Sequence, residues 1–197
     1  MSDTFISLLI FAAVATLTPG GATTLATASG VQFGYWRSLP LLAGNAGGLA
    51  ILCATAGAGL GALLLAVPEL TLAMRVAGSA YLLWLAWRIG SAGPPSSGGR
   101  TEPMGVLTGL LLLVVNPKAW TMALGGAASF ATLAASPAEL ALILGGVFGL
   151  SGITALSLWC AGGTLLGKVI RSDRQWRAAN VTLGLLLALS VVPIWMG

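Results

Sequence analysis

Proline interrupts two long apolar stretches of this 197-residue chain. In the first stretch, which begins at Phe5, the interruption reads Thr18-Pro19-Gly20-Gly21. Proline has no backbone N–H and its ring clashes with the preceding turn, so it kinks or breaks a helix. We therefore expect two half-helices here, with backbone groups that are free to meet a ligand and glycines that allow its close approach.

The second interruption follows an apolar stretch that begins at Met104, and it reads Asn116-Pro117-Lys118. Its proline comes 98 positions after Pro19, which is about half the length of the chain. Proline and glycine breaks at corresponding points of two halves indicate the binding site of a transporter built from inverted repeats.

The composition places these stretches in a membrane. Apolar residues make up 57% of the chain and charged residues 7%, whereas soluble domains carry about 25% charged residues. The net charge of +4 does not indicate nucleic-acid binding, because the basic residues form no stripe with aromatic residues. The chain has no histidine and two distant cysteines, Cys53 and Cys160, so we expect no metal site, no cofactor and no disulfide framework.

Six segments supply the roughly 20 apolar residues that a membrane helix needs. We predict spans at residues 4–28, about 40–67, about 72–89, 104–133, 139–166 and 179–196. The fold class is therefore an all-α integral membrane protein with one transmembrane domain over residues 1–197. Its six helices are expected to form an inverted 3+3 repeat in which the first and fourth helices are broken by proline. The boundaries are a first repeat at 1–90, a linker at 91–103 and a second repeat at 104–197.

The basic residues predict the orientation of these spans. Lys and Arg are in excess in cytoplasmic loops, and most of them fall on one predicted side of the membrane. That side holds Arg37, Arg88, Arg100, Lys168, Arg171, Arg174 and Arg177, whereas Arg75 alone falls on the other. We therefore expect the N-terminus and the C-terminus outside.

Lys118 is a charge predicted at membrane depth, about 14 residues into the fourth span. A charge at that depth costs at least about 2.5–3.5 kcal/mol, so such residues are functional by default, although a long lysine can also reach towards the membrane surface. No Asp or Glu is expected at the same depth. We therefore expect its partner to be a carboxylate or another anionic group on a ligand. A metal cation as substrate is not expected, because hard cations need oxygen ligands.

Polar residues at depth supply further candidates for the lining of a site. Asn116 and Tyr81 are the preferred ones, since both can orient a small polar ligand. The remaining candidates, each of which also fits an interhelical hydrogen bond, are Asn45, Thr55, Ser79, Thr121, Ser151, Thr154 and Ser157. Glycines spaced four apart, such as Gly44/Gly48 and Gly163/Gly167, indicate helices that pack closely in a bundle.

These motifs together resemble those of the LysE/RhtB-type amino-acid exporters over nearly the full length of the chain. The resemblance rests on Thr18-Pro19-Gly20, Gly34 with Arg37, the segment Arg75–Leu85 with Tyr81, and Gly109 followed by Asn116-Pro117-Lys118-Ala119. It implies a bacterial inner-membrane exporter of amino acids or related metabolites, driven by the proton-motive force.

The chain departs from this family's usual pattern at two places. Members usually read Thr-Pro-Gly-Pro-Asn in the first span, where this chain has Gly21 and Ala22. Many members also carry an acidic residue in the second or fifth span, where this chain has Leu49 and Ser151-Gly152. A cationic, lysine-like substrate is therefore not expected.

We expect a secondary active exporter of a small metabolite, a neutral amino acid or a derivative, working by alternating access with proton coupling, and not an enzyme. The alternative is a non-transporting membrane scaffold or assembly factor derived from this family. The expected partners are the substrate and the lipid bilayer, not nucleic acid, and the glycine-rich faces allow a homodimer. The predicted substrate-binding residues are Thr18, Pro19, Gly20, Gly21, Tyr81, Asn116, Pro117 and Lys118.

Overall fold

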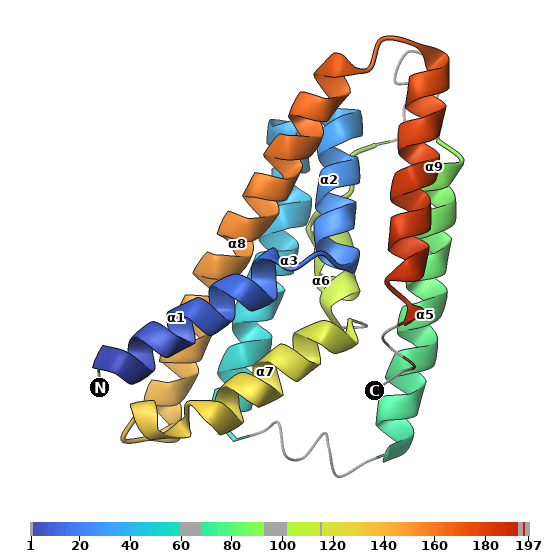
Figure 1. Cartoon of the computed structure of the whole chain (residues 1–197). Helices are drawn as coiled ribbons and strands as arrows, with labels where there is room; N and C mark the ends of the chain where they lie inside the picture. Colours follow the sequence, from blue (N-terminus) through green and yellow to red (C-terminus); the bar gives the residue numbers. More distant parts are fainter. Residues whose placement is uncertain (1, 60–67, 93–101, 115, 193–194, 196–197) are drawn as a thin grey trace.

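The computed structural model describes residues 2–59, 68–92, 102–114, 116–192 and 195 (Figure 1). Within these ranges the regular structure consists of eight α-helices and one short 3₁₀ helix, η1, without a strand. The elements are α1 (Ser2–Leu17), α2 (Gly21–Phe33), α3 (Tyr35–Gly57), α5 (Pro68–Gly90), α6 (Val106–Val114), α7 (Pro117–Ser129), η1 (Ala131–Leu133), α8 (Pro137–Val169) and α9 (Asp173–Leu189).

Two pairs of consecutive helices are sharply bent. The axes of α1 and α2 meet at 57° and those of α6 and α7 at 67°. Each second half-helix has a defined start. The Asn116 side chain accepts a hydrogen bond from the Lys118 backbone N–H at 3.1 Å, and Pro117 occupies the first helical turn, where no N–H is needed. At the start of α2, the Gly20 N–H donates to the Thr23 hydroxyl oxygen at 2.8 Å.

Two helices, α3 and α8, are long and apolar enough to cross a membrane. If each bent pair is one span, the described part of the chain holds up to four spans. The outer surface is apolar, with Leu142 79% exposed and Leu150 70% exposed. Lipid tails are as apolar as leucine, so such a surface is expected of a membrane protein.

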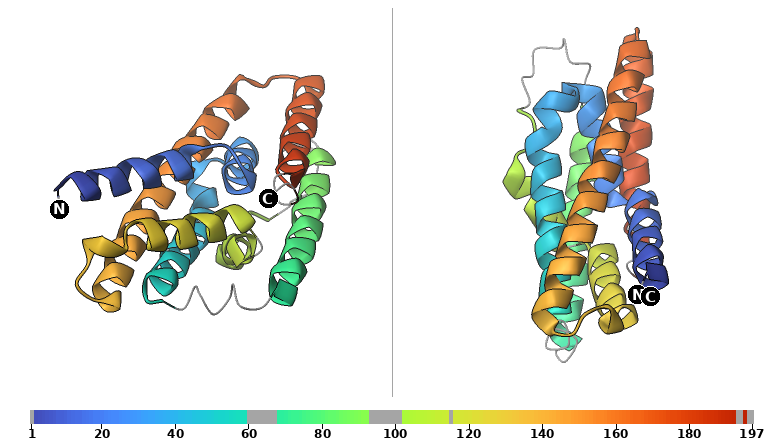
Figure 2. Two further views of the ribbon diagram at one scale, coloured as in Figure 1. Left: turned by 60° about the horizontal axis from the view of Figure 1, so that its bottom comes forward. Right: turned by 90° about the vertical axis from the view of Figure 1, so that its left-hand side faces the viewer.

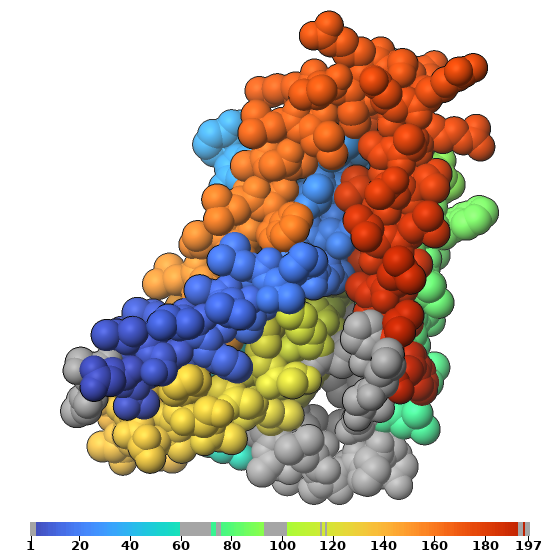
Figure 3. Space-filling view, viewed as in Figure 1, coloured from blue at the N-terminus to red at the C-terminus, as the bar shows by residue number. Residues whose placement is uncertain are grey.

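The centre of the bundle is the contact between α3 and α8. Helix α2 packs on α8, helix α6 packs on α3, and α5 pairs with α9. Helices α1 and α7 lie side by side and are tilted against the rest of the bundle (Figures 1 and 2). The space-filling view shows α1, in blue, lying along α7, in yellow (Figure 3). The ring of Phe11 on α1 contacts the rings of Phe130, which follows α7, and Phe148 on α8, with centroids 5.7 and 6.0 Å apart.

Glycines allow the closest of these helix contacts. A Cβ atom on Gly163 of α8 would clash with the carbonyl oxygen of Thr27 on α2, and one on Gly109 of α6 with that of Leu41 on α3. The predicted packing role of the spaced glycines is thus confirmed at these positions. By contrast, an added Cβ atom on the neighbouring Gly162 would meet no atom within 4 Å.

Apart from Lys118, the basic residues whose side chains are described gather at one end of the bundle. The α2–α3 junction, the C-terminal end of α5 and the α8–α9 turn meet there (Figure 1). These segments carry Arg37, Arg88, Lys168, Arg171, Arg174 and Arg177. The side chains of Arg75 and Arg100, which also entered the predicted orientation, lie outside the described residues.

The last helix begins earlier than the sequence indicates. Helix α9 starts at Asp173 rather than near residue 179, because Ser172 and Gln175 form a capping box. The Ser172 hydroxyl oxygen accepts from the Gln175 N–H at 3.3 Å, and the Gln175 side chain accepts from the Ser172 N–H at 3.2 Å. The basic residues of this segment therefore lie at the end of α8, in the turn that follows it and at the start of α9.

Candidate functional site

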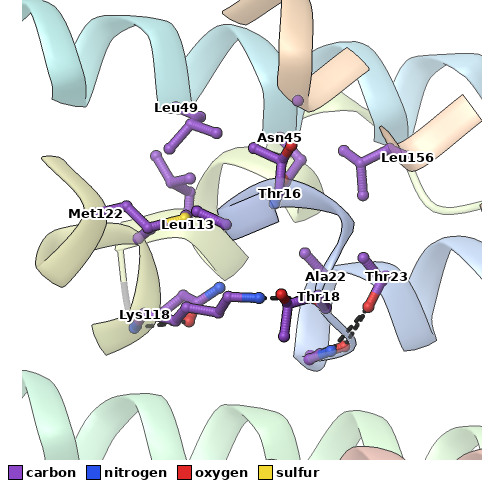
Figure 4. Close-up of a pocket in the computed structure, with 16 residues that line it drawn as sticks. Thr16, Thr18, Ala22, Thr23, Asn45, Leu49, Leu113, Lys118, Met122 and Leu156 are labelled. Atoms are coloured by element: carbon purple, nitrogen blue, oxygen red, sulfur yellow. Dashed lines mark hydrogen bonds between the residues drawn. The ribbon is translucent and has the colours of Figure 1, made fainter. Parts of the chain in front are cut away.

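The two helix interruptions meet in space. The Nζ atom of Lys118, in the first turn of α7, donates a hydrogen bond of 2.7 Å to the backbone carbonyl oxygen of Thr18 (Figure 4). Thr18 lies between α1 and α2, 100 positions earlier in the chain. The break between α1 and α2 leaves the Thr18 carbonyl group without a partner N–H within a helix. The Lys118 side chain, from the break between α6 and α7, supplies the missing hydrogen bond.

A cavity of about 40 Å³ lies at this junction. It is lined by residues of the α1–α2 break, α3, the α6–α7 break and α8. Its polar lining consists of Thr16, Thr18, Thr23, Asn45, Asn116 and Lys118, and its larger apolar side chains are Leu49, Leu113, Met122 and Leu156. One water needs roughly 10–15 Å³ measured in this way, so the cavity has room for about three waters.

The cavity is electropositive. Lys118 is the one charged residue among the described residues that line it, and no carboxylate lines it. The N-terminal ends of α2 and α7 also open onto it, through Gly20 and Gly21 and through Asn116 and Ala119. A helix N-terminus carries a partial positive charge and free N–H groups. Together these features suit an anionic group such as a carboxylate.

Two tryptophans satisfy carbonyl groups where the first half-helices end. The indole N–H of Trp159, on α8, donates to the carbonyl of Leu17 at 3.2 Å, and the indole N–H of Trp120 donates to that of Val114 at 2.9 Å. The Thr18 hydroxyl donates back to the Val14 carbonyl at 2.6 Å. The breaks are thus held open by specific hydrogen bonds rather than left with unsatisfied backbone groups.

Most of the predicted binding residues line the cavity. Those that do are Thr18, Gly20, Gly21, Asn116 and Lys118. Pro19 is exposed and is not among the lining residues, and the side chain of Pro117 lies outside the described residues. Tyr81 is not among them either. It stacks on Trp84 with ring centroids 5.8 Å apart and packs against the apolar cluster of α2, α5 and α9.

Further polar residues line the cavity, among them Thr16, which the sequence did not single out, and Asn45, which was one of several polar candidates at depth. Thr16 is a polar residue in the last turn of α1, beside the break at Thr18, which is a signal that could have identified it. Asn45 carried a signal only as a polar residue at depth. The role of Trp159 carried none, because it lies 142 positions from the carbonyl group that it binds.

Comparison with known proteins supports the assignment that the motifs indicate. The sequence profile of the LysE type translocator family matches residues 13–192. A cysteine/O-acetylserine efflux protein of Salmonella typhimurium is 30% identical over 191 residues, and one of Escherichia coli O157:H7 is 28% identical over 189 residues, each match covering 92% of both chains. A protein of the same name from Klebsiella pneumoniae is 36% identical over 119 residues, which are 60% of this chain and 61% of that one.

No solved structure shows a significant match. The profile nevertheless covers nearly the whole chain, including both helix breaks and the residues that line the cavity between them. The resemblance inferred from the motifs is confirmed: the chain belongs to the LysE type translocator family.

Proposed function

We propose that this protein is a secondary active exporter of a small neutral amino acid or amino-acid derivative in the bacterial inner membrane. One observation carries the proposal. In the cavity where two helix breaks meet, Lys118 is bound to a backbone carbonyl group and not to a carboxylate. Its cation is therefore available to a substrate carboxylate. Family membership and the efflux names of the relatives favour this function over a non-transporting scaffold or an enzyme.

In this proposal the substrate carboxylate replaces the Thr18 carbonyl group as the acceptor for Lys118. The N–H groups in the first turn of α2, from Gly21 onwards, supply further donors, whereas the Gly20 N–H is already bound to Thr23. The Lys118–Thr18 bond has a charged donor and a neutral acceptor, whereas a carboxylate acceptor adds the attraction of opposite charges, so the exchange is favourable. Because the Lys118–Thr18 bond joins the two breaks, substrate binding loosens their contact. Binding is thereby coupled to a change in shape.

The small volume of the cavity supports alternating access. A space for about three waters is too small for an amino acid, so the substrate must enter when the walls separate. We propose that one half of the chain rocks against the other around this site. Lys118 is then also the candidate proton carrier, since the described residues that line the cavity include no carboxylate.

The order of helices supports an inverted repeat. A bent pair, a long helix and a further helix occur twice, as α1–α2, α3 and α5 and then as α6–α7, α8 and α9. The proposed equivalents α3 and α8 contact each other, as do α5 and α9. If α5 and α9 are also membrane spans, they add to α3, α8 and the two bent pairs to give six spans. With the basic end of the bundle in the cytoplasm, both termini lie outside.

The cavity walls and the relatives indicate the substrate class. The relatives are named for cysteine and O-acetylserine, which are small neutral amino acids. The apolar walls formed by Leu49, Leu113, Met122 and Leu156 suit such side chains. In the part of the chain that the structure describes, no carboxylate lines the cavity to balance a second positive charge, so a lysine-like substrate is disfavoured.

Two measurements test this function. Untargeted analysis of the medium is compared between cells that overexpress the protein and cells that lack its gene. We expect neutral amino acids, O-acetylserine or cysteine among them, to rise with expression. In proteoliposomes, the purified protein should catalyse counterflow of radiolabelled O-acetyl-L-serine. If folded protein shows neither effect with any amino acid, the proposal is wrong.

A further inference from the structure

Asn45 of α3 reaches into the cavity and is only 6% exposed. Figure 4 shows it between Leu49 and Leu156, on the opposite side of the cavity from Lys118. The proposed function gives this side chain no role so far. A buried carboxamide is costly wherever one of its polar atoms lacks a partner, so the direction of each atom carries information.

The orientation of this carboxamide is fixed by its neighbour. The Nδ2 atom of Asn45 donates to the backbone carbonyl oxygen of Gly109 on α6 at 3.2 Å. A carbonyl oxygen can only accept, so the nitrogen must face Gly109 and Oδ1 must point away from it. The helices approach so closely here that a Cβ atom on Gly109 would lie 2.6 Å from the Asn45 backbone nitrogen. The amide therefore has little freedom to turn.

The Oδ1 atom of Asn45 is left open towards the cavity. Oδ1 has no hydrogen-bond partner among the described residues. Every fully buried side-chain polar atom of those residues has a partner, so Oδ1 is not fully buried and is accessible from the cavity that Asn45 lines. Thr16 adds a second acceptor. Its hydroxyl, in a side chain 8% exposed, donates to the Ala12 carbonyl at 2.8 Å, which leaves oxygen lone pairs free.

The cavity is therefore polarised. Lys118 and the N-terminal ends of α2 and α7 present donors on one side, and Asn45 and Thr16 present acceptors on the other. An α-amino acid has the matching arrangement, with a carboxylate and an ammonium group on one carbon atom.

We propose that Asn45 Oδ1, assisted by the Thr16 hydroxyl oxygen, accepts a hydrogen bond from the α-ammonium group of the substrate. The inference rests on the proposed function, since it takes the substrate carboxylate to lie at Lys118. Asn45 thereby makes the site specific for amino acids rather than for carboxylic acids in general. A site that hydrogen-bonds a substrate group rejects the analogue without that group, because its own buried atom is left without a partner.

The test uses counterflow of radiolabelled O-acetyl-L-serine in proteoliposomes. The competitors are unlabelled O-acetyl-L-serine and 3-acetoxypropanoate, the same molecule without its amino group. The variants are Asn45→Leu and Thr16→Val, with Thr55→Val as the matched control. Thr55 lies on the same helix as Asn45, donates to the Ile51 carbonyl at 2.7 Å and does not line the cavity.

For the wild type, half-inhibition should need at least about tenfold more of the des-amino competitor, as expected for one hydrogen bond to a charged group. Asn45→Leu should reduce this preference to about twofold or less, Thr16→Val should reduce it in part, and Thr55→Val should keep it.

Equal inhibition of the wild type by both competitors would overturn the inference about Asn45 without contradicting the proposed export function. A preference for O-acetyl-L-serine that is unchanged in Asn45→Leu would overturn it in the same way. If folded wild-type protein shows no counterflow, the proposed function itself fails. The wild-type comparison needs no substitution, so the inference stays testable even if Asn45→Leu does not fold.

Discussion

The ammonium nitrogen of Lys118 lies 2.7 Å from the backbone carbonyl oxygen of Thr18, so a single hydrogen bond joins the two helix breaks. The cation of the cavity is thus held by a neutral acceptor that a carboxylate can displace. We therefore expect the substrate and Thr18 to compete for Lys118. This competition would link substrate binding to the contact between the two helix breaks.

The space beside Lys118 can be narrowed without straining the backbone. Gly20 has φ −178° and ψ −173°, an extended conformation that alanine also adopts. A Cβ atom there would lie 3.6 Å from Lys118 Nζ and Cδ. We expect Gly20→Ala to raise KM for O-acetyl-L-serine several-fold with little change in Tm. Gly47→Ala is the control, because its Cβ atom would meet nothing within 4 Å. Equal kinetics in the two variants would place the substrate elsewhere.

Two adjacent glycines of α8 should respond in opposite ways. Gly163→Ala forces a Cβ atom against the Thr27 carbonyl of α2, and such overpacking costs about 1–3 kcal/mol. Gly162→Ala meets no atom within 4 Å and should be neutral or stabilising by up to about 1 kcal/mol, since alanine favours a helix over glycine. Thermal unfolding in detergent measures both. A Gly163→Ala variant as stable as the wild type would contradict the close α2–α8 contact.

Trp159 should hold the end of α1 in place. Trp159→Phe keeps a smaller aromatic ring but removes the indole N–H that donates to the Leu17 carbonyl at 3.2 Å. We expect a loss of about 1 kcal/mol in stability and faster hydrogen exchange at the end of α1. Trp36→Phe, at a side chain 79% exposed, serves as the control. Unchanged exchange in Trp159→Phe would show that this hydrogen bond does not support the break.

The proposed orientation can be measured with single cysteines. Cys53 and Cys160 are each 0% exposed, so the native background of labelling should be low. An impermeant maleimide should label Asp3→Cys in intact cells and Arg171→Cys only after the cells are opened, because the basic end is expected in the cytoplasm. The reverse pattern would mean that both termini lie inside.

The site was easiest to predict from residue types that are rare inside a membrane helix. A lysine and two prolines within apolar stretches identified the segments that line the cavity. The partner of Lys118 could not be found in this way, because every residue has a backbone carbonyl group and Thr18 is 100 positions away. The predicted lack of a nearby carboxylate agrees with the lining of the cavity in the described residues.

Orientation around a helix axis was harder to predict. Tyr81 was expected in the site but stacks on Trp84. Both lipid and protein interior are apolar, so a membrane helix carries little periodic signal of which face points inward. The 98-residue offset between the two prolines also matches Gly47-Gly48 to Gly145-Gly146 in the sequence. The first glycines of these pairs have different surroundings, because a Cβ atom on Gly47 would meet nothing within 4 Å whereas Gly145 packs on Ala50. That match does not support a repeat.

The competition between the substrate and Thr18 for Lys118 can be measured by counterflow of O-acetyl-L-serine with the variants Lys118→Met and Lys168→Met. Methionine keeps the length of the side chain and removes its charge, and Lys168 lies on the exposed tip of α8, outside the cavity. Losing one partner of a buried charged pair costs at least about 2 kcal/mol. We therefore predict that Lys118→Met lowers kcat/KM at least about tenfold, while Lys168→Met stays near the wild type. Equal kcat/KM in wild type and Lys118→Met would contradict the claim that substrate and Thr18 compete for Lys118.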